Sequence, residues 1–146
     1  MTLSSNLVEA LHRVGQIADE GFMLLAGGTL TPRQRAVLVA VARLEDPSQT
    51  DLVEATGIDR STMADLVRRL SARGLIARRK TRKDARRYAV RLTPKGLDAI
   101  RDTDHAAEEA AALLIRRMPV THRKPFLEGL ACISKAGSLE MPRAVA

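Results

Sequence analysis

Residues 48–96 read SQTDLVEATGIDRSTMADLVRRLSARGLIARRKTRKDARRYAVRLTPKG, and this stretch decides the fold. Its apolar spacing predicts two short helices that meet at Gly57, then two strands, then the start of another helix. Two helices joined by a glycine-containing turn of about three to four residues are typical of a helix-turn-helix unit. A helix-turn-helix that continues into a basic β-hairpin predicts a winged helix. Similar helical hairpins also occur in cores that bind nothing, so this pattern alone leaves the function open.

Capping residues mark where the predicted helices begin. Thr31 is a good N-cap and Pro32 suits the first helical position. Thr93 and Pro94 repeat this arrangement later in the chain. The predicted helices occupy residues 4–26, 32–45, 49–56, 60–73, 94–117 and 122–136, and the predicted strands occupy residues 75–80 and 87–92. The expected fold class is therefore mainly α with a small β-hairpin wing.

Positive charge is concentrated in one segment of the chain. Residues 59–91 contain twelve Lys and Arg against three acids, a local charge of +9, whereas the whole chain carries +7. Such a concentration favours contact with a polyanion, because neutralising phosphates releases condensed counterions. A basic run can also be a solvated helix face, but apolar residues recur regularly through this segment, so it should fold. Aromatic residues make up only 2% of the chain, which favours duplex over single-stranded nucleic acid, whose bases usually stack on aromatic side chains.

Other features narrow the class of protein. No stretch approaches the roughly 18 to 20 apolar residues that span a membrane, and residues 1–15 show no signal-peptide pattern. With Cys132 as the single cysteine, an internal disulfide is impossible and a cytoplasmic location is expected. The three histidines lie far apart without metal-ligand spacing, so no metal, no cofactor and no enzymatic activity are expected.

Five ordered motifs resemble those of the MarR-type (multiple antibiotic resistance regulator) winged-helix transcription factors. They are Asp59-Arg60-Ser61-Thr62, Leu66-Val67-Arg68-Arg69-Leu70, Arg73-Gly74-Leu75-Ile76, Asp84-Ala85-Arg86 and Leu92-Thr93-Pro94-Lys95-Gly96. The family's wing pattern, Asp-x-Arg followed by Leu-Thr-x-x-Gly, is present at the usual spacing. The resemblance covers most of the chain and implies a transcriptional regulator that binds double-stranded DNA. Repression is expected, because the family usually represses.

The resemblance also implies an obligate homodimer. It assigns residues 1–30 to an N-terminal dimerisation helix, residues 31–93 to the winged helix-turn-helix and residues 94–146 to C-terminal dimerisation helices. The terminal helices agree, because they are too few and too apolar to close a core alone. Ala106, Ala107 and residues 110–112 would allow close packing at such an interface, although alanine also simply favours helix. A two-fold dimer predicts an inverted-repeat operator with half-sites roughly 34 Å apart.

The expected DNA contacts form two sets. The recognition-helix set, with its supporting helix, comprises Gln49, Thr50, Arg60, Ser61, Thr62, Asp65, Arg68 and Arg69, and the wing set comprises Arg82, Lys83, Asp84, Arg86 and Arg87. The first set is expected to approach base edges and phosphates in the major groove. In the wing, Arg86 is expected to enter a narrow, A·T-rich minor groove, with Asp84 as its orienting partner in the family's pattern. Arg82, Lys83 and Arg87 would add phosphate contacts.

Asp65 is an unusual residue for a surface that meets phosphates. It can accept a hydrogen bond from a cytosine amino group, or it can hold Arg68 or Arg69 in an i,i+3 or i,i+4 pair. The pairing is favoured, because a carboxylate facing phosphates must otherwise be compensated. Four further cations are expected to have less to do with DNA: Arg73, Arg78, Arg79 and Arg91.

Two modes of control are open. MarR-like proteins commonly bind a small, often aromatic or anionic effector, and the first, second and fifth predicted helices would line that cleft here. His12, Gln16 and Arg43 are the polar candidates, although each also fits a surface or interface position. Oxidation of Cys132 is the other mode, but its apolar neighbours predict a buried, inert thiol. The alternatives are a DNA binder without small-molecule control, either architectural or antitoxin-like, and a protein interaction module.

Overall fold

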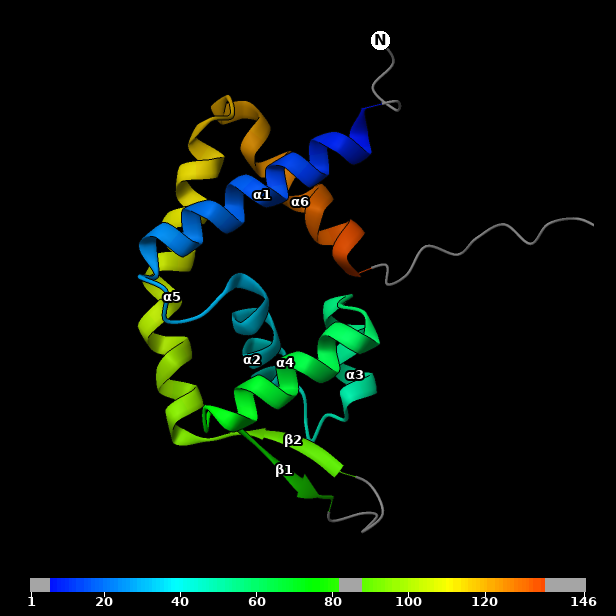
Figure 1. Cartoon of the computed structure of the whole chain (residues 1–146). Coiled ribbons are helices and arrows are strands. Elements are labelled where there is room, and N and C mark those ends of the chain that lie inside the picture. Colours follow the sequence, from blue (N-terminus) through cyan, green and yellow to red (C-terminus); the bar gives the residue numbers. More distant parts are fainter. Residues whose placement is uncertain (1–5, 82–87, 136–146) are drawn as a thin grey trace, which may run out of the picture.

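The computed structural model describes residues 6–81 and 88–135, which form six helices and one antiparallel β-hairpin. The elements in chain order are α1 (Leu7–Leu25), α2 (Pro32–Arg43), α3 (Gln49–Thr56), α4 (Arg60–Ala72), β1 (Ile76–Lys80), β2 (Tyr88–Leu92), α5 (Pro94–Arg116) and α6 (Val120–Lys135). Helices α2 to α4 and the hairpin gather at one end of the molecule, α1 and α6 lie at the other, and α5 connects the two ends (Figure 1). The expected fold class is confirmed.

Local capping chemistry explains why most helices begin where the sequence predicts. Thr31 Oγ1 accepts a hydrogen bond from the backbone N–H of Gln34 at 3.2 Å, and Gln34 Oε1 accepts one from the Thr31 N–H at 3.0 Å. Ser48 and Asp51 form the same reciprocal capping box at α3. The last helix differs from the prediction, because α6 begins at Val120 and already contains the residue expected to cap it, Thr121. Its predicted stop, Gly137, lies outside the described residues.

One hydrophobic core holds the helix-turn-helix and the hairpin together. Its buried side chains come from every element of that end of the molecule, and they include Val37, Leu38, Leu52, Met63, Val67, Leu70, Ile76 and Val90. β1 and β2 pair in the register Ile76 to Leu92 and Lys80 to Tyr88, so Arg78 lies opposite Val90. The winged helix is therefore a packed unit whose surface positions are set by its core.

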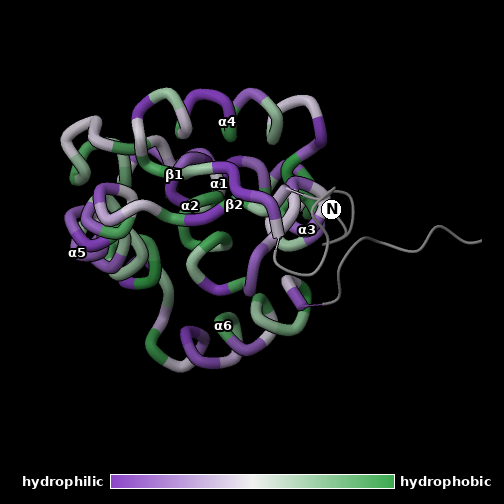
Figure 2. The backbone as a smooth tube through the Cα atoms, turned by 90° about the horizontal axis from the view of Figure 1, so that it is seen from below, coloured by the Kyte–Doolittle hydropathy of each residue, from purple (hydrophilic) through white to green (hydrophobic). Residues whose placement is uncertain are grey.

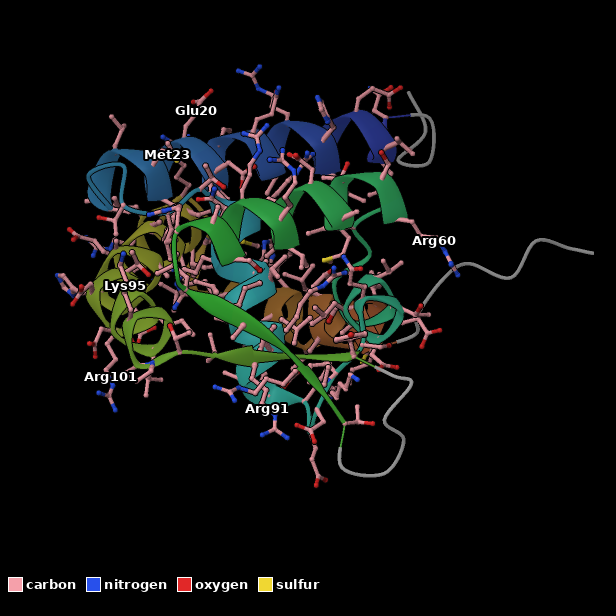
Figure 3. All side chains as sticks on the ribbon, turned by 60° about the horizontal axis from the view of Figure 1, so that its bottom comes forward. Glu20, Met23, Arg60, Arg91, Lys95 and Arg101 are labelled. Carbon is pink, nitrogen blue, oxygen red and sulfur yellow. The ribbon has the colours of Figure 1, made fainter. Side chains whose placement is uncertain are left out.

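The base of the hairpin is also tied to the α2–α3 connection. The Val90 N–H donates to the Pro47 carbonyl at 2.8 Å, and Arg91 makes a two-pronged pair with Asp46, with Nε–Oδ1 at 2.7 Å and Nη2–Oδ2 at 2.8 Å. Figure 3 shows Arg91 beside the strands of the hairpin. Arg91 thus has a structural role, because it holds the hairpin against the helices.

A second, smaller core joins α1 to α5. Phe22 packs against Ala106 and Ala110, and all three are buried. The alanines expected to lie at a dimer interface are thus partly used inside the chain. None of the residues of α6 is buried, and Cys132 is exposed. The expectation of a buried thiol is therefore wrong for the single chain, because α6 has no apolar surface packed over that side chain. Within residues 6–81 and 88–135, no helix is long and apolar enough to cross a membrane.

Candidate nucleic-acid interface

Helix α4 presents one apolar and one polar face. Met63, Leu66, Val67 and Leu70 are buried in the core, as their spacing of three and four residues requires. The opposite face is exposed and hydrophilic, and Figure 2 shows its hydrophilic turns on the outside of the molecule, on the opposite side from α6. A second helix held this way by a helix-turn-helix is the element that enters the major groove in DNA-binding members of this fold.

The structure brings the predicted recognition-helix residues together on this surface. Thr50, Arg60, Ser61, Arg68 and Arg69 are exposed, while Gln49, Thr62 and Asp65 are half-buried. Arg60 projects from the beginning of α4, away from the body of the molecule (Figure 3). The wing residues Arg82, Lys83, Asp84, Arg86 and Arg87 lie outside the described residues, so their roles stay predictions.

Asp65 holds the two arginines that follow it on α4. Its carboxylate accepts a hydrogen bond from Arg68 Nη2, and its Oδ2 lies 2.7 Å from Arg69 Nε. The hydrogen bond from Arg68 and the positive charge of Arg69 keep the pKa of Asp65 below its ordinary value. The predicted i,i+3 and i,i+4 pairing is confirmed. It orients both guanidinium groups on the exposed face and also offsets part of their charge.

Asp59 caps the beginning of α4. Its Oδ1 accepts a hydrogen bond from the Thr62 N–H at 2.9 Å, and hydrogen bonding by Thr62 lowers the pKa of the carboxyl group. This N–H is therefore satisfied within the chain, and a phosphate placed on it would meet a carboxylate. The helix end is thus a poor phosphate site, and Arg60 is its main cationic group.

The Asp59 cap makes the stability of the domain sensitive to acid. Because its folded-state pKa is lowered, Asp59 stabilises the fold above its unfolded-state pKa, and this contribution is lost as the pH falls below about 4. We expect Asp59→Asn, which keeps a capping oxygen but cannot titrate, to show a shallower loss of stability between about pH 5 and pH 3. Urea unfolding midpoints across that pH range measure the difference, and parallel profiles for the two proteins would contradict it.

A hollow of about 390 Å³ lies between α3, α4 and β1. It is lined by Gln49, Ala64, Val67, Arg68, Ser71 and Arg78. Arg78 Nη2 donates to Gln49 Oε1 at 2.6 Å. Arg78 is not among the DNA contacts predicted from the sequence. The alternation of a strand puts it on the same side of β1 as buried Ile76, toward the helices. That alternation is the sequence signal for a side chain directed toward α3 and α4.

Another hollow, of about 290 Å³, lies between α1, α2 and α5, where the family resemblance implies an effector cleft. Asp19 and Arg35 are its two charged lining residues. Arg35 pairs with Asp104 through Nη2, while its Nε is shielded from solvent and has no hydrogen-bond partner among the described residues. The predicted effector residues His12, Gln16 and Arg43 are exposed and do not line this hollow.

Comparisons with known proteins agree with this architecture. A model of the MarR family matches residues 29–87. The putative transcriptional regulatory protein for the hcr operon of Thauera aromatica is 31% identical over 119 residues, covering 70% of each chain. BpsR of Bordetella bronchiseptica is 27% identical with a TM-score of 0.80 over 92% of this chain and 96% of its own. CouR of Rhodococcus jostii RHA1 is 25% identical with a TM-score of 0.78 over 96% of this chain and 99% of its own.

These matches and the structure concern the same residues. The family model spans the helix-turn-helix and the first strand of the hairpin, and the structural matches extend over the terminal helices as well. The relatives named by role are transcriptional regulators. The chain belongs to the MarR family of winged-helix transcriptional regulators.

Proposed function

We propose that this regulator binds an inverted-repeat operator in double-stranded DNA as a homodimer, represses transcription, and leaves the DNA when a small-molecule effector binds. The observation that carries the proposal is the polar face of α4, where Arg60, Arg68 and Arg69 are exposed while the opposite face is locked in the core. Support also comes from CouR, a transcriptional repressor solved on a 23-mer DNA duplex, with a TM-score of 0.75 and 26% identity to this chain. Since duplex DNA is the partner, the chain is expected to act in the cytoplasm.

Contacts at the wing belong to the same proposal. Arg86 would enter the minor groove beside the half-site with Asp84 as its partner, and Arg82, Lys83 and Arg87 would meet phosphates. The pair between Arg91 and Asp46 supports this arrangement, because it ties the base of the hairpin to the α2–α3 connection of the helix-turn-helix. Recognition helix and wing would then approach the DNA as one rigid surface.

Uncovered apolar surface supports the homodimer. The apolar stripe of α1 is covered only in its second half, where Phe22 packs on α5, while Leu7 and Leu11 are 55% and 51% exposed. In α6, Leu130 and Ile133 are 45% and 70% exposed. Contiguous apolar faces of this kind mark interaction surfaces. A second copy of the chain would cover both helices and bring two recognition helices to one face, as an inverted repeat requires.

Replacing apolar residues of this surface is expected to weaken the dimer. A charge buried at an interface is destabilising when it has no partner, so Leu11→Asp and Leu130→Asp should each raise the dimer dissociation constant at least about 100-fold. Leu24→Asp is the control, because Leu24 is 85% exposed and lies off the α1 stripe. Sedimentation equilibrium measures all three. A dimer of native strength in both stripe variants would contradict this interface.

The effector is proposed to be an aromatic acid that binds between α1, α2 and α5. BpsR is regulated by 6-hydroxynicotinic acid, and CouR was solved with p-coumaroyl-CoA. In this chain, the unpartnered Nε of Arg35 is a donor for a carboxylate, and Phe22 gives an apolar wall for a ring. A panel of aromatic acids, each tested for release of the operator by fluorescence anisotropy, examines this step. Release that persists in Arg35→Gln at native effector concentrations would exclude Arg35 as the effector contact.

Binding to DNA upstream of the protein's own gene tests the proposed function. The full-length chain should bind this duplex at least about 1,000-fold more tightly than a random duplex of equal length, with affinity that falls steeply with salt. Equal affinity for the two duplexes would favour an architectural DNA binder.

Regulation by oxidation of Cys132 is the alternative to a small-molecule effector, and the exposure of this thiol supports it. It predicts that peroxide abolishes operator binding by the native protein and leaves Cys132→Ser unaffected.

A further inference from the structure

The hollow between α3, α4 and β1 contains two guanidinium groups in different electrostatic settings. Arg68 shares the carboxylate of Asp65, whereas Arg78 is held by the neutral amide oxygen of Gln49 at 2.6 Å. None of the six lining residues is acidic. Arg78 therefore keeps its full charge in a fixed position, and the hydrogen bond to Gln49 reduces the side-chain entropy lost when it meets an anion.

A second polar group in this hollow has no partner. Ser71 lies on α4 near its end, and its Oγ is shielded from solvent without a hydrogen bond to any described residue. Burying a hydroxyl group without a hydrogen bond costs free energy, and an acceptor that binds beside it removes this cost. The lining thus joins a fixed guanidinium group to an unused hydroxyl donor, and both groups suit the oxygen atoms of a phosphate.

The position of the hollow selects the kind of phosphate. It opens between α4, whose exposed face is proposed to enter the major groove, and β1, the first strand of the hairpin. A sugar-phosphate strand separates the major groove from the neighbouring minor groove. If the recognition helix and the wing occupy adjacent grooves, the DNA backbone that separates these grooves must pass over the protein surface between α4 and the hairpin.

We propose that this hollow is a binding site for one DNA backbone phosphate, in which Arg78, positioned by Gln49, is the principal contact and Ser71 supplies a hydroxyl donor. The inference rests on the proposed function, since it concerns how the chain binds DNA. It adds a residue of β1 to the interface and gives Gln49 an indirect role, as the residue that positions Arg78. The site would set the register of the protein on the duplex without reading its sequence.

The alternation of β1 supplies a matched control for Arg78. Arg79 is the next residue, is also exposed and carries the same charge, but its side chain leaves the opposite face of the strand. Arg78→Ala should weaken binding to the upstream duplex and to a random duplex by the same factor, about 5- to 20-fold. It should also reduce the slope of log affinity against log salt by about 0.9 for each protomer bound. Arg79→Ala should reduce affinity less than about 3-fold.

Gln49 tests the positioning role. Gln49→Ala should weaken binding in the native background and have no further effect in Arg78→Ala, because its contribution acts through the guanidinium group. Thermal unfolding of all variants checks that the substitutions leave the fold intact. Equal losses for Arg78→Ala and Arg79→Ala, or additive losses for Gln49→Ala and Arg78→Ala, would overturn the phosphate site. If the native protein binds neither duplex, the proposed function itself fails, and this outcome is separate from the others.

Neutralising one DNA phosphate at a time identifies the phosphate that Arg78 contacts. Methylphosphonate substitution removes the charge of one phosphate at a time in the upstream duplex. We expect one such phosphate per half-site, between the major-groove contact and the flanking minor groove. Its substitution should weaken DNA binding by the native protein and leave DNA binding by Arg78→Ala unchanged. Equal sensitivity of the two proteins at every phosphate would overturn the assignment of Arg78 to a single phosphate.

Discussion

Gly96→Ala is expected to have the largest effect on stability of any glycine-to-alanine change inside the described helices. A Cβ atom at position 96 would lie 2.0 Å from the carbonyl oxygen of Leu75 and 3.1 Å from Leu92 Cδ2. The same carbonyl accepts hydrogen bonds from the N–H and the Oγ1 of Thr93, so it cannot move freely. Because backbone would have to shift, we expect the free energy of unfolding to fall by about 3 kcal/mol or more.

Gly21→Ala is the matched control for this prediction. Gly21 also lies inside a helix, but its added Cβ would meet Ala110 Cβ at 3.7 Å, an ordinary contact distance. Alanine is the better helix former by about 0.5 to 1 kcal/mol, so this variant should be as stable as the native protein or more stable. Thermal unfolding at one protein concentration should place Gly96→Ala roughly 6 to 12 °C below the native protein. Similar unfolding midpoints for the two variants would show that the stability of the fold does not depend on the close contact between Gly96 and the Leu75 carbonyl.

Arg60→Ala is expected to have the largest effect on operator recognition among the described residues. Arg60 is the first residue of α4 and is exposed, and no ion pair engages it in the described part of the chain. Arg68 and Arg69, in contrast, share Asp65. A guanidinium group free to make a two-pronged contact with guanine contributes about 1 to 3 kcal/mol of discrimination, so operator affinity should fall about 5- to 150-fold. Affinity for random duplex should fall much less.

Arg101→Ala controls for the loss of one positive charge. Arg101 is exposed on α5 and lies 3.7 Å from Asp98, and Figure 3 shows it and Arg60 at well-separated places on the molecule. This variant should bind operator within about 2-fold of the native protein, because a distant exposed charge is screened. Anisotropy titrations with both duplexes compare the proteins. Equal losses on operator and on random duplex would assign Arg60 to phosphate contact, against the base-reading role expected here.

The parts of the structure that sequence predicts well are those set by neighbouring residues. Thr31, Ser48 and Asp59 cap the helices that follow them, and each cap depends on residues only three positions away. The pairs made by Asp65 likewise follow from the spacing of an α-helix. Gly96 matches a glycine of the family pattern, but the sequence does not show why a glycine is needed there. The structure gives the reason, because the Leu75 carbonyl lies where a Cβ atom would be.

The parts that sequence did not predict depend on tertiary structure. Arg78 with Gln49 and Arg35 with Asp104 are separated by 29 and 69 residues, so no local spacing indicates that they meet. Cys132 was expected to be buried because its neighbours are apolar. An apolar stripe does not show whether it is covered by its own chain or by a second copy, and α6 is uncovered in the single chain. His12 and Gln16 do not line the hollow for the same reason, because exposure along α1 depends on how α5 packs, and Arg43 lies at the far end of α2 from Pro32 and Arg35, which do line it.

Hydroxyl-radical footprinting of the DNA upstream of the protein's own gene tests the central claim most directly. If two copies of α4 read one operator, the protein should protect two patches related by a dyad, centred about one helical turn, roughly 34 Å, apart on the same face of the duplex. Their sequences should form an inverted repeat, and Arg60→Ala should remove both patches at protein concentrations that saturate the native complex. Protection of a single patch, or uniform protection without a dyad, would contradict the account.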